Sequence, residues 1–429
     1  WGGFVDPKGG TALLLSWRMD HVQNQQRFFQ AHVAPRLREA GRRLSFVIIS
    51  DALRYEAAEE LTRELNGKYR FEARLGSQLG VLPSYTALGM ACLLPHEKLE
   101  YKPNGEVLVD GRPTSSLDQR SKILESVEGL AVRADELLAM KKEAGRKFVK
   151  EARLVYIYQN VIDATGDHAL TEGSTFEAVR RAIEELATVV SYVINNLNGN
   201  HVIITSDHGF LFTESPPGEP DKSSLPEKPP GTVKAKKRYL VGRELGDHDA
   251  VWHGLISATA GVEGEMEFWI PKGLNRFHFM GGARFVHGGA MLQEIVVPVV
   301  TVRHIKGKSL AKTRTKRVTV HVLGSSHKIT TSRYRFEMIQ MEPVSERVRP
   351  ITLKVAVYED DEPVTNIESV TFDSSSDKME ERQKSVTLVL QGRRYDKKKN
   401  YRLVLRDAET GVEEESVNVI IDRAFTDDF

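Results

Sequence analysis

The chain has 429 residues, of which 40% are hydrophobic and 28% are charged, so it is long enough for two or three globular domains. Its formal charge of +1 excludes an overall basic character, so any nucleic-acid binding would have to use local patches. The single cysteine, Cys92, excludes an internal disulfide and a multi-cysteine metal site. No apolar run approaches the roughly 20 residues that span a bilayer. We therefore expect a soluble, cytoplasmic protein that makes no membrane contact.

The first 40 residues have the pattern expected between two domains. The chain begins at Trp1 without a methionine, and Ser16 to Arg38 has the pattern of a charged amphipathic helix. We expect residues 1–40 to be a helical linker that ends a preceding domain, and the whole chain to be the C-terminal part of a longer polypeptide.

Strands and helices alternate from about residue 41 to residue 305. The continuous β-rich runs are Leu44 to Ser50, Arg153 to Ile162, His201 to Ser206 and Glu294 to Val302. A helical pattern follows the first run, and Phe176 to Leu197 is a long helix with apolar residues on one side. This alternation predicts an α/β domain with a mainly parallel sheet, helices on both faces, and sites at the carboxyl ends of the strands.

Two insertions interrupt the alternation. Tyr101 to Thr114 has Asn-Gly and Asp-Gly turn signals around a short β run, and Ser121 to Lys150 has a helical pattern. We expect these segments to form a cap subdomain at about 97–150. Thr213 to Thr232 is rich in proline, serine and charged residues, which predicts a mobile loop next to the Asp-His pair at 207–208.

The pattern changes to strands alone from about Lys306. A basic segment, Lys306 to Arg317, comes first, and five runs that alternate apolar and polar residues follow it. We expect residues 306–429 to form an all-β, immunoglobulin-like sandwich, because about 120 residues is a size at which such domains fold alone.

Polar residues stand where the buried strands end. Asp51 follows the first strand directly, and Asp207 and His208 follow the third, just before Gly209. Either aspartate alone is more often the cap of a helix or turn than a ligand. The Asp-His pair is harder to explain in that way, because burial at a dry sheet edge costs hydration unless a cation or hydrogen bonds compensate.

Hydroxyl groups and further ligand types stand near these strand ends. Ser84 and Thr86 start a short apolar helix, where a hydroxyl beside a bound cation becomes a nucleophile, although Ser84 equally fits a helix cap. Nitrogen and oxygen ligands without sulfur suit zinc or manganese in a paired site. The candidate set is Asp51, Thr86, Asp163, His168, Asp207, His208 and His287. Taken singly, His287 is more often a turn or core histidine, and Asp163 also fits a loop cap.

Five motifs in this order resemble the PglZ family of the alkaline phosphatase superfamily, a component of bacterial BREX phage-defence systems. The motifs are "ISDALRYEAAEEL", "LPSYTALGM", "VIDATGDH", "ITSDHGFLF" and "VHGGAMLQEIVVP". The resemblance implies an alkaline-phosphatase-like fold over residues 41–305 and an accessory β domain after it. It also implies a metal-dependent phosphodiesterase or nuclease with two Zn²⁺ sites, or Mn²⁺ in their place. Its partners would be other BREX defence proteins, and its substrate DNA or another phosphodiester.

The resemblance also implies a role for each matching residue, with Thr86 as the catalytic nucleophile. The first metal would be held by Asp51, Thr86, Asp207 and His208. The second would be held by Asp163, His287 and either Asp167 or His168. The family pattern places Asp and His four residues apart in the middle motif. Here the residue four after Asp163 is Asp167, and the histidine comes one residue later, so the second site departs from the pattern.

Two other classes of function stay open. The altered middle motif and the β domain also fit a metal-binding scaffold of a defence complex, with weak or lost catalysis. A small-molecule phosphatase or mutase of the same superfamily would need a cap shaped for one substrate. A basic run could contact phosphates in any of these classes, although such a run in a linker is more often only solvated. The candidates are Lys234, Lys236, Lys237 and Arg238, and the segment Lys306 to Arg317.

Overall fold

The computed structural model describes residues 1–5, 13–39, 44–68, 71–215, 222–223, 228–277, 284–304, 316–324 and 326–422. The chain divides into two compact units, Trp1–Gly307 and Lys308–Phe429. Half of the expected proline-rich loop, at 216–221 and 224–227, and most of the basic segment after residue 305 lie outside the described residues. Among the helices of the described residues, none is long and apolar enough to cross a bilayer.

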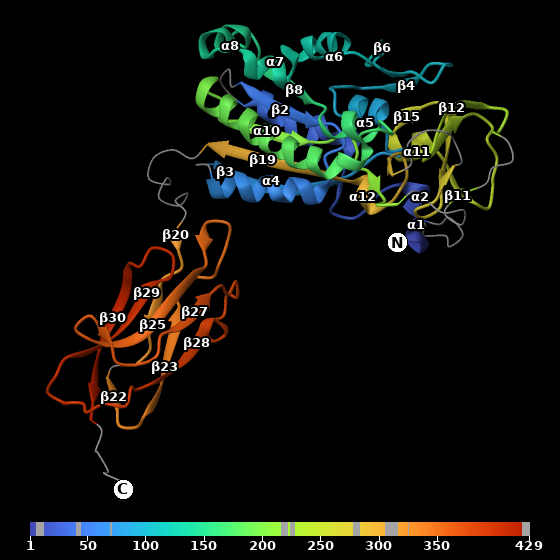
Figure 1. Cartoon of the computed structure of the whole chain (residues 1–429). Coiled ribbons are helices and arrows are strands. Elements are labelled where there is room, and N and C mark those ends of the chain that lie inside the picture. Colours follow the sequence, from blue (N-terminus) through green and yellow to red (C-terminus); the bar gives the residue numbers. More distant parts are fainter. Residues whose placement is uncertain are drawn as a thin grey trace. The chain divides into compact units, whose positions relative to one another are not determined.

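The first unit is built on a seven-stranded sheet in the order β1-β3-β19-β9-β2-β8-β7 (Figure 1). Its strands are β1 (Gln23–Asn24), β2 (Ser45–Ser50), β3 (Phe71–Leu79), β7 (Gly129–Arg133), β8 (Leu154–Gln159), β9 (His201–Thr205) and β19 (Val296–His304). Strands β9, β2, β8 and β7 pair in parallel, as do β1 and β3. Strand β19 is antiparallel to both of its neighbours, β3 and β9. The sheet is therefore mixed, with the parallel part that the sequence predicts and one reversed strand in its interior.

The central strands are apolar because helices or loops cover both faces of the sheet. Phe46 and Ile48 of β2 belong to one core cluster, and Val47 and Ile49 belong to the other, as the alternation along a strand requires. Helices α4 (Tyr55–Lys68) and α10 (Thr175–Asn196) contribute to the first cluster, and α5 (Thr86–Cys92) contributes to the second (Figure 1). The predicted packing on both faces is confirmed.

The expected single helix over Ser16–Arg38 is wrong. The segment forms β1, the 3₁₀ helix η2 (Gln25–Arg27), the π-helix η3 (Phe29–Val33) and α3 (Ala34–Arg38). Trp17 is fully buried, and its Nε1 donates to Gly80 O at 2.8 Å. Pairing with β3 and burial of such aromatic side chains outweigh the local helical pattern. The described part of residues 1–40 is thus packed into the first unit and does not stand apart as a linker.

The range 97–150, where we expected a cap, has two parts. Strands β4 (Leu99–Tyr101), β5 (Val107–Val109) and β6 (Arg112–Pro113) form hairpins, whose turns use positive φ angles at Gly105, Asp110 and Gly111. The helical expectation for Ser121–Lys150 is wrong at Gly129–Arg133, because this segment pairs with β8 as the edge strand β7. The helices around it are α6 (Leu117–Leu124), η4 (Glu125–Val127), α7 (Ala134–Ala139) and α8 (Lys142–Phe148).

A second, antiparallel sheet lies between β9 and β19 in the chain, and the sequence patterns did not predict it. Its order is β12 (Thr232–Lys236), β13 (Tyr239–Gly242), β16 (Glu267–Pro271) and β14 (Val251–Leu255). The remaining elements of the unit are α1 (Gly2–Val5), α2 (Leu13–Ser16), α9 (Ile162–Gly166), η5 (Glu172–Ser174), β10 (Leu211–Phe212), β11 (Lys222–Ser223), α11 (Ile256–Ala260), β15 (Val262–Glu263), β17 (Arg276–Phe277), β18 (Phe285–Val286) and α12 (Leu292–Ile295).

The second unit consists of strands, with one short 3₁₀ helix, in the residues that the structure describes. One sheet contains β21 (Val320–Val322), β23 (Arg333–Gln340) and β28 (Gln383–Val389). The other contains β22 (His327–Ile329), β30 (Glu413–Ile421), β29 (Tyr401–Asp407), β25 (Ile351–Glu359), β26 (Glu362–Pro363) and β27 (Glu368–Phe372). The minor elements are β20 (Lys316–Arg317), β24 (Val348–Arg349) and η8 (Met379–Arg382). Side chains from both sheets share one apolar core, which agrees with the predicted all-β fold.

Candidate metal centre and its cavity

The carboxyl ends of β2 and β9 bring Asp51, Asp207 and His208 together. The two strands pair in parallel, with Ile49 opposite Thr205, so the residues after each strand leave the sheet at the same edge. His208 Nε2 lies 3.7 Å from Asp51 Oδ1 and 3.3 Å from Asp207 Oδ2. All three side chains are buried. The structure thus forms the cluster that the sequence motifs predict.

Two carboxylate oxygens in this cluster have no hydrogen-bond partner among the described residues. They are Asp51 Oδ1 and Asp207 Oδ2, the two atoms that lie close to His208 Nε2. The other ring nitrogen of His208, Nδ1, donates to Gly209 O at 2.9 Å, so Nε2 keeps its lone pair. Two buried carboxylate oxygens without a donor, beside a neutral imidazole, form an arrangement that a bound cation would stabilise.

Burial changes the protonation of all three groups. Desolvation raises the pKa of Asp51 well above its ordinary value, and the charges of Asp207 and Asp163 add to that effect. Desolvation also raises the pKa of Asp207 to about 6 and lowers the pKa of His208 to about 3. At neutral pH the imidazole is therefore uncharged and does not neutralise the carboxylates. A positive charge supplied from outside the chain would do so.

The hydroxyl of Thr86 lies in the same cluster. Thr86 is the first residue of α5, and its Oγ1 lies 3.0 Å from His208 Nε2. The helix comes this close because Gly89 has no side chain; a Cβ there would lie 2.3 Å from Asp207 O. The buried Ser84 hydroxyl donates to Gly289 O at 2.7 Å instead. Of the two hydroxyls that the sequence offers, Thr86 is therefore the one in contact with the candidate ligands.

A second cluster joins the first through His208. The His287 ring stacks on the His208 ring with the centroids 4.0 Å apart, and His287 Nε2 lies 3.8 Å from Asp163 Oδ1. Asp163 Oδ1 is a third buried oxygen without a hydrogen-bond partner among the described residues. One ligand atom each from Asp163, His208 and His287 lies within 4.8 Å of the others. The two clusters are adjacent, as a paired metal site requires.

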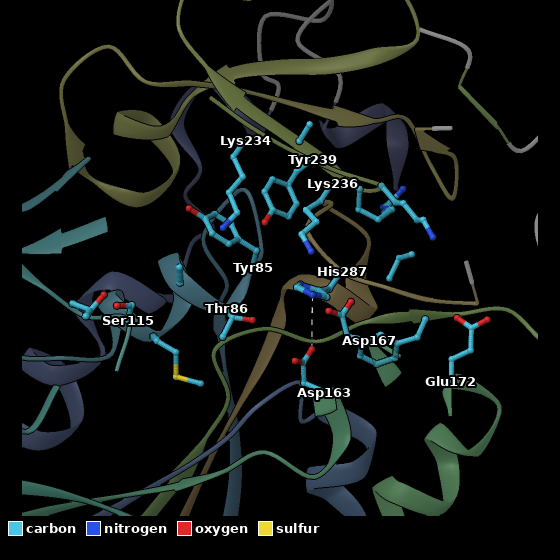
Figure 2. Close-up of a pocket in the computed structure, with 18 of the residues that line it drawn as sticks. Tyr85, Thr86, Ser115, Asp163, Asp167, Glu172, Lys234, Lys236, Tyr239 and His287 are labelled. Carbon is cyan, nitrogen blue, oxygen red and sulfur yellow. Dashed lines mark ion pairs between the residues drawn. The ribbon is translucent and has the colours of Figure 1, made fainter. Parts of the chain in front are cut away.

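The structure distinguishes the two alternatives in the middle motif. Asp167 follows Asp163 by one helical turn, with Asp167 N donating to Asp163 O at 2.9 Å. Asp167 lines the same cavity as Asp163 and His287, and Figure 2 shows its carboxylate directed towards His287. Asp167 and His168 are both exposed, and neither belongs to the ligand clusters found among the described residues, so the cavity lining, which includes Asp167 and not His168, is what separates them.

A cavity of about 610 Å³ adjoins the second cluster through Asp163 and His287, and the first cluster through Thr86. Asp51, Asp207 and His208 are not among its lining residues. Thr86, Asp163 and His287 lie on one side of it, and strands β12 and β13 supply the opposite wall (Figure 2). The basic residues of that wall are Lys234, Lys236, Lys237 and Arg238.

Arg238 differs from the three lysines. Its side chain is fully buried, and its guanidinium pairs with Glu294 through Nη2–Oε2 at 2.6 Å and Nε–Oε1 at 3.1 Å. Glu294 also accepts hydrogen bonds from the backbone N–H groups of Gly289 and Met291. Arg238 is therefore neither free to contact phosphate nor only solvated, which were the two alternatives for the basic run, because its charge is already matched by Glu294 and holds the loop that carries His287.

The sequence motifs missed two residues that shape this site. Gln25, from the N-terminal segment, donates to Asp207 O at 2.7 Å and to Ser206 O at 3.1 Å. Arg120, from α6, lines the cavity, and its charge opposes the effect of burial on the pKa of Asp51. Neither residue stands in a motif or at the end of a strand that the sequence predicts. Only the tertiary fold brings them to the site.

Comparison with known proteins places these residues in a family. The family model described as "BREX system PglZ alkaline phosphatase-like domain" matches residues 28–302. The chain is 43% identical over 421 residues to the alkaline phosphatase-like protein BrxZ of Escherichia coli O9:H4 (strain HS). It is 36% identical over 420 residues to the alkaline phosphatase-like protein PglZ of Bacillus cereus (strain H3081.97). The alignments cover 97% and 96% of this chain but 49% and 48% of the relatives, so the chain spans about half of their length.

The chain also has distant similarities among solved structures. Murine ectonucleotide pyrophosphatase/phosphodiesterase 5 aligns with a TM-score of 0.40 and 10% identity, over 61% of this chain and 88% of that one. Phosphonoacetate hydrolase from Sinorhizobium meliloti 1021, in complex with phosphonoformate, aligns with a TM-score of 0.38 and 13% identity, over 61% and 90%. The family match is much stronger; it contains the main sheet from β2 to residue 302 in β19, without β1, together with all the candidate ligands. The chain therefore belongs to the PglZ family and carries its alkaline phosphatase-like domain.

Proposed function

We propose that this chain is a metal-dependent phosphoryl-transfer hydrolase that cleaves phosphodiesters in BREX anti-phage defence. One observation supports this proposal most directly. Three buried carboxylate oxygens, from Asp51, Asp163 and Asp207, surround His208 and His287 without a hydrogen-bond donor among the described residues. The charged forms of these carboxylates are costly to bury without a partner, and bound cations would offset that cost.

The donor set fits two cations. The first would be held by Asp51, Thr86, Asp207 and His208. The second would be held by Asp163, Asp167 and His287, with Asp167 in preference to His168 because only Asp167 lines the cavity. Nitrogen and oxygen donors without sulfur suit Zn²⁺, with Mn²⁺ as the alternative. When bound, such cations would neutralise the carboxylates and polarise a phosphoryl oxygen.

In the proposed reaction Thr86 acts as the nucleophile. Attack of Oγ1 on phosphorus forms a phosphothreonyl ester, and the bond to the leaving alkoxide breaks with its electron pair. The hydroxyl proton passes to water in the cavity. In the metal-free chain His208 Nε2, 3.0 Å from Oγ1, accepts the hydroxyl hydrogen, and a cation held by Nε2 would replace that hydrogen bond. A second water then hydrolyses the ester and regenerates Thr86.

Variants of Thr86 and Asp207 separate attack from cation binding. Thr86→Ala should lower the hydrolysis of bis(p-nitrophenyl) phosphate by about 100-fold or more while elemental analysis still finds most of the cation. Thr86→Ser should retain part of the activity. Asp207→Ala should lose both cation and activity, because it removes a charged ligand. Ser84→Ala is the matched control and should keep both, because its hydroxyl is bonded to the backbone.

The outcomes can also contradict the scheme. Full activity in Thr86→Ala with an inactive Ser84→Ala would move the nucleophile to Ser84. Full activity in both variants would mean that water attacks directly. Preparations that contain no cation under any loading condition would refute the metal-dependent hydrolase as a whole.

A catalytically weak scaffold is a second candidate, because Asp167 stands where the family pattern has histidine and His168 lies away from the cavity. Loss of phage defence in Asp207→Ala, combined with no phosphoester turnover by the wild type, would favour the scaffold. We further propose that other BREX proteins are partners, that DNA is a substrate, and that the second unit is an immunoglobulin-like sandwich.

A further inference from the structure

Two lysines of β12 face the cavity from the wall opposite the candidate metal ligands. Lys234 and Lys236 are two residues apart, so a strand places them on the same face. Both line the cavity, and Figure 2 shows both side chains directed into it. Val233, the residue before Lys234, lies against the turn at Gly105 instead. The strand thus aims two ammonium groups at one volume.

These two ammonium groups lack the carboxylate partners that lysines elsewhere in the unit have. Among the residues that the structure describes, no carboxylate pairs with Lys234 or Lys236. In contrast, Lys98 lies 2.9 Å from Glu100 and 2.7 Å from Glu263, and Lys102 lies 2.6 Å from Glu106.

The surroundings of Lys234 make an anion favourable there. Its Nζ lies 4.5 Å from the centre of the Tyr85 ring, and burial, together with the like charge of Lys236, lowers its pKa. An anion bound between the two lysines would remove this repulsion and replace the lost hydration. Lys237 is a different case, because the negative charges of Glu172 and Asp167 already oppose the effect of its burial.

The position of this pair relative to the nucleophile limits what the anion can be. Tyr85, whose ring lies under Lys234, directly precedes Thr86 in the chain. The Tyr85 ring also stacks on that of Tyr239, at 4.6 Å between centroids, which fixes the lysine wall to the start of α5. The cleaved phosphate would occupy the side of the cavity with the metal ligands, so the lysines would contact a different group of the same molecule.

We propose that Lys234 and Lys236 form an anion subsite for a second phosphate of the substrate, adjacent to the phosphate that is cleaved. The proposal rests on the proposed function and narrows its substrate class. The site would favour a nucleotide chain that carries neighbouring phosphates over a single phosphodiester or a monophosphate.

Equilibrium binding tests the subsite without requiring turnover. Thymidine 3′,5′-bisphosphate and thymidine 5′-monophosphate are titrated into the zinc-loaded full chain. The wild type should bind the bisphosphate about tenfold more tightly, as an added charge-assisted contact of ordinary strength gives. Lys234→Gln/Lys236→Gln should reduce this preference to about threefold or less. Lys98→Gln/Lys102→Gln makes the same change in net charge outside the cavity and should keep the preference.

Turnover then separates the subsite from the hydrolase itself. With bis(p-nitrophenyl) phosphate, which has one phosphate, Lys234→Gln/Lys236→Gln should raise KM by no more than about threefold, because only the general charge of the cavity changes. With a 5′-phosphorylated thymidine dinucleotide, its KM should rise about tenfold at an unchanged kcat. If the wild type prefers the bisphosphate but hydrolyses neither substrate, the result supports the subsite and refutes the proposed hydrolase.

Two results would overturn the subsite. The first is equal binding of the bisphosphate by the wild type and Lys234→Gln/Lys236→Gln. The second is a loss of affinity that is equal for every ligand, including the monophosphate. Both double variants would show this loss, and high salt would remove it. This second result would mean that the lysines act only through the general field of the protein.

Discussion

At the residue scale, Asp51, Asp207 and His208 share a buried site in which desolvation shifts each pKa towards the uncharged form. For Asp207 the shift runs from 3.8 to about 6, so the folded, metal-free protein holds this proton more tightly than the unfolded chain does. The contribution of Asp207 to the free energy of unfolding is complete below the pKa that Asp207 has in the unfolded chain. It is lost as the pH rises through the pKa that Asp207 has in the folded protein. The shift of His208, to about 3, acts in the opposite sense over an overlapping range.

Asp207→Asn removes the titration of Asp207 together with the part of the Asp51 shift that the charge of Asp207 causes, so a comparison with this variant measures the coupled pair. Between about pH 4 and pH 6, the metal-free wild type should lose roughly 2 to 3 kcal/mol of unfolding free energy relative to the variant, with little further change above pH 6. Urea denaturation at several pH values in the presence of a chelator measures the difference. Parallel pH profiles for the two proteins would show that Asp207 has an ordinary pKa.

The sequence predicted most of the residues in the site because strand ends and helix starts are visible in its patterns. Asp51, Asp207 and His208 follow strand ends that the parallel pairing of β2 and β9 brings together. Thr86 stands at a helix start, and the close approach of α5 brings it to them. The choice between Asp167 and His168 depends on the direction of a single helical turn, which spacing alone left open. Gln25 could not be predicted, because its role depends on two backbone carbonyls about 180 residues away.

At the element scale, α5 lies against the backbone that follows β9. Gly89 makes this approach possible, since a Cβ at that position would lie 2.3 Å from Asp207 O and 2.8 Å from Asp207 C. These are backbone atoms at a strand end and cannot move aside easily. The position of Thr86 relative to His208 therefore depends on a glycine one helical turn further along α5.

Gly89→Ala should displace α5 and separate Thr86 from His208. We expect at least about a tenfold loss of phosphodiester hydrolysis, and a destabilisation of about 1 to 3 kcal/mol, as is typical of overpacking. Steady-state kinetics and thermal denaturation measure both. Gly76→Ala in β3 is the control, because its Cβ would lie an ordinary 3.6 Å from Val299 O. Wild-type activity and stability in Gly89→Ala would mean that the space between α5 and the Asp207 backbone accommodates a methyl group.

Elements with continuous apolar runs were predicted well, and elements with mixed patterns were not. Strands β2, β8, β9 and β19 are apolar because both sides are covered, and this pattern stands out in the sequence. Strand β3 has charged residues such as Glu72 and Arg74 at partly or fully exposed positions, so the run looked irregular. Its place in the sheet comes from pairing with β19, which is more than 200 residues away and has no local signal.

At the scale of the whole molecule, the two compact units have separate apolar cores. A chain that ends at Gly307 should therefore keep the fold and the metal content of the first unit. Circular dichroism, thermal denaturation and elemental analysis of residues 1–307 check this expectation. Residues 308–429, produced separately, should give the spectrum of a folded β protein. Loss of cooperative unfolding in the shorter chain would show that the two units stabilise one another.

The interior position of β19 has a consequence for how the protein is made. Residues 296–304 form this strand, yet it lies between β3 and β9, both of which precede it in the chain. While the ribosome is still adding these residues, β3 and β9 each have an open edge with unpaired N–H and C=O groups, which can capture strands of other chains. The nascent protein is therefore most exposed to aggregation until His304 has left the exit tunnel, and slower translation lengthens that interval.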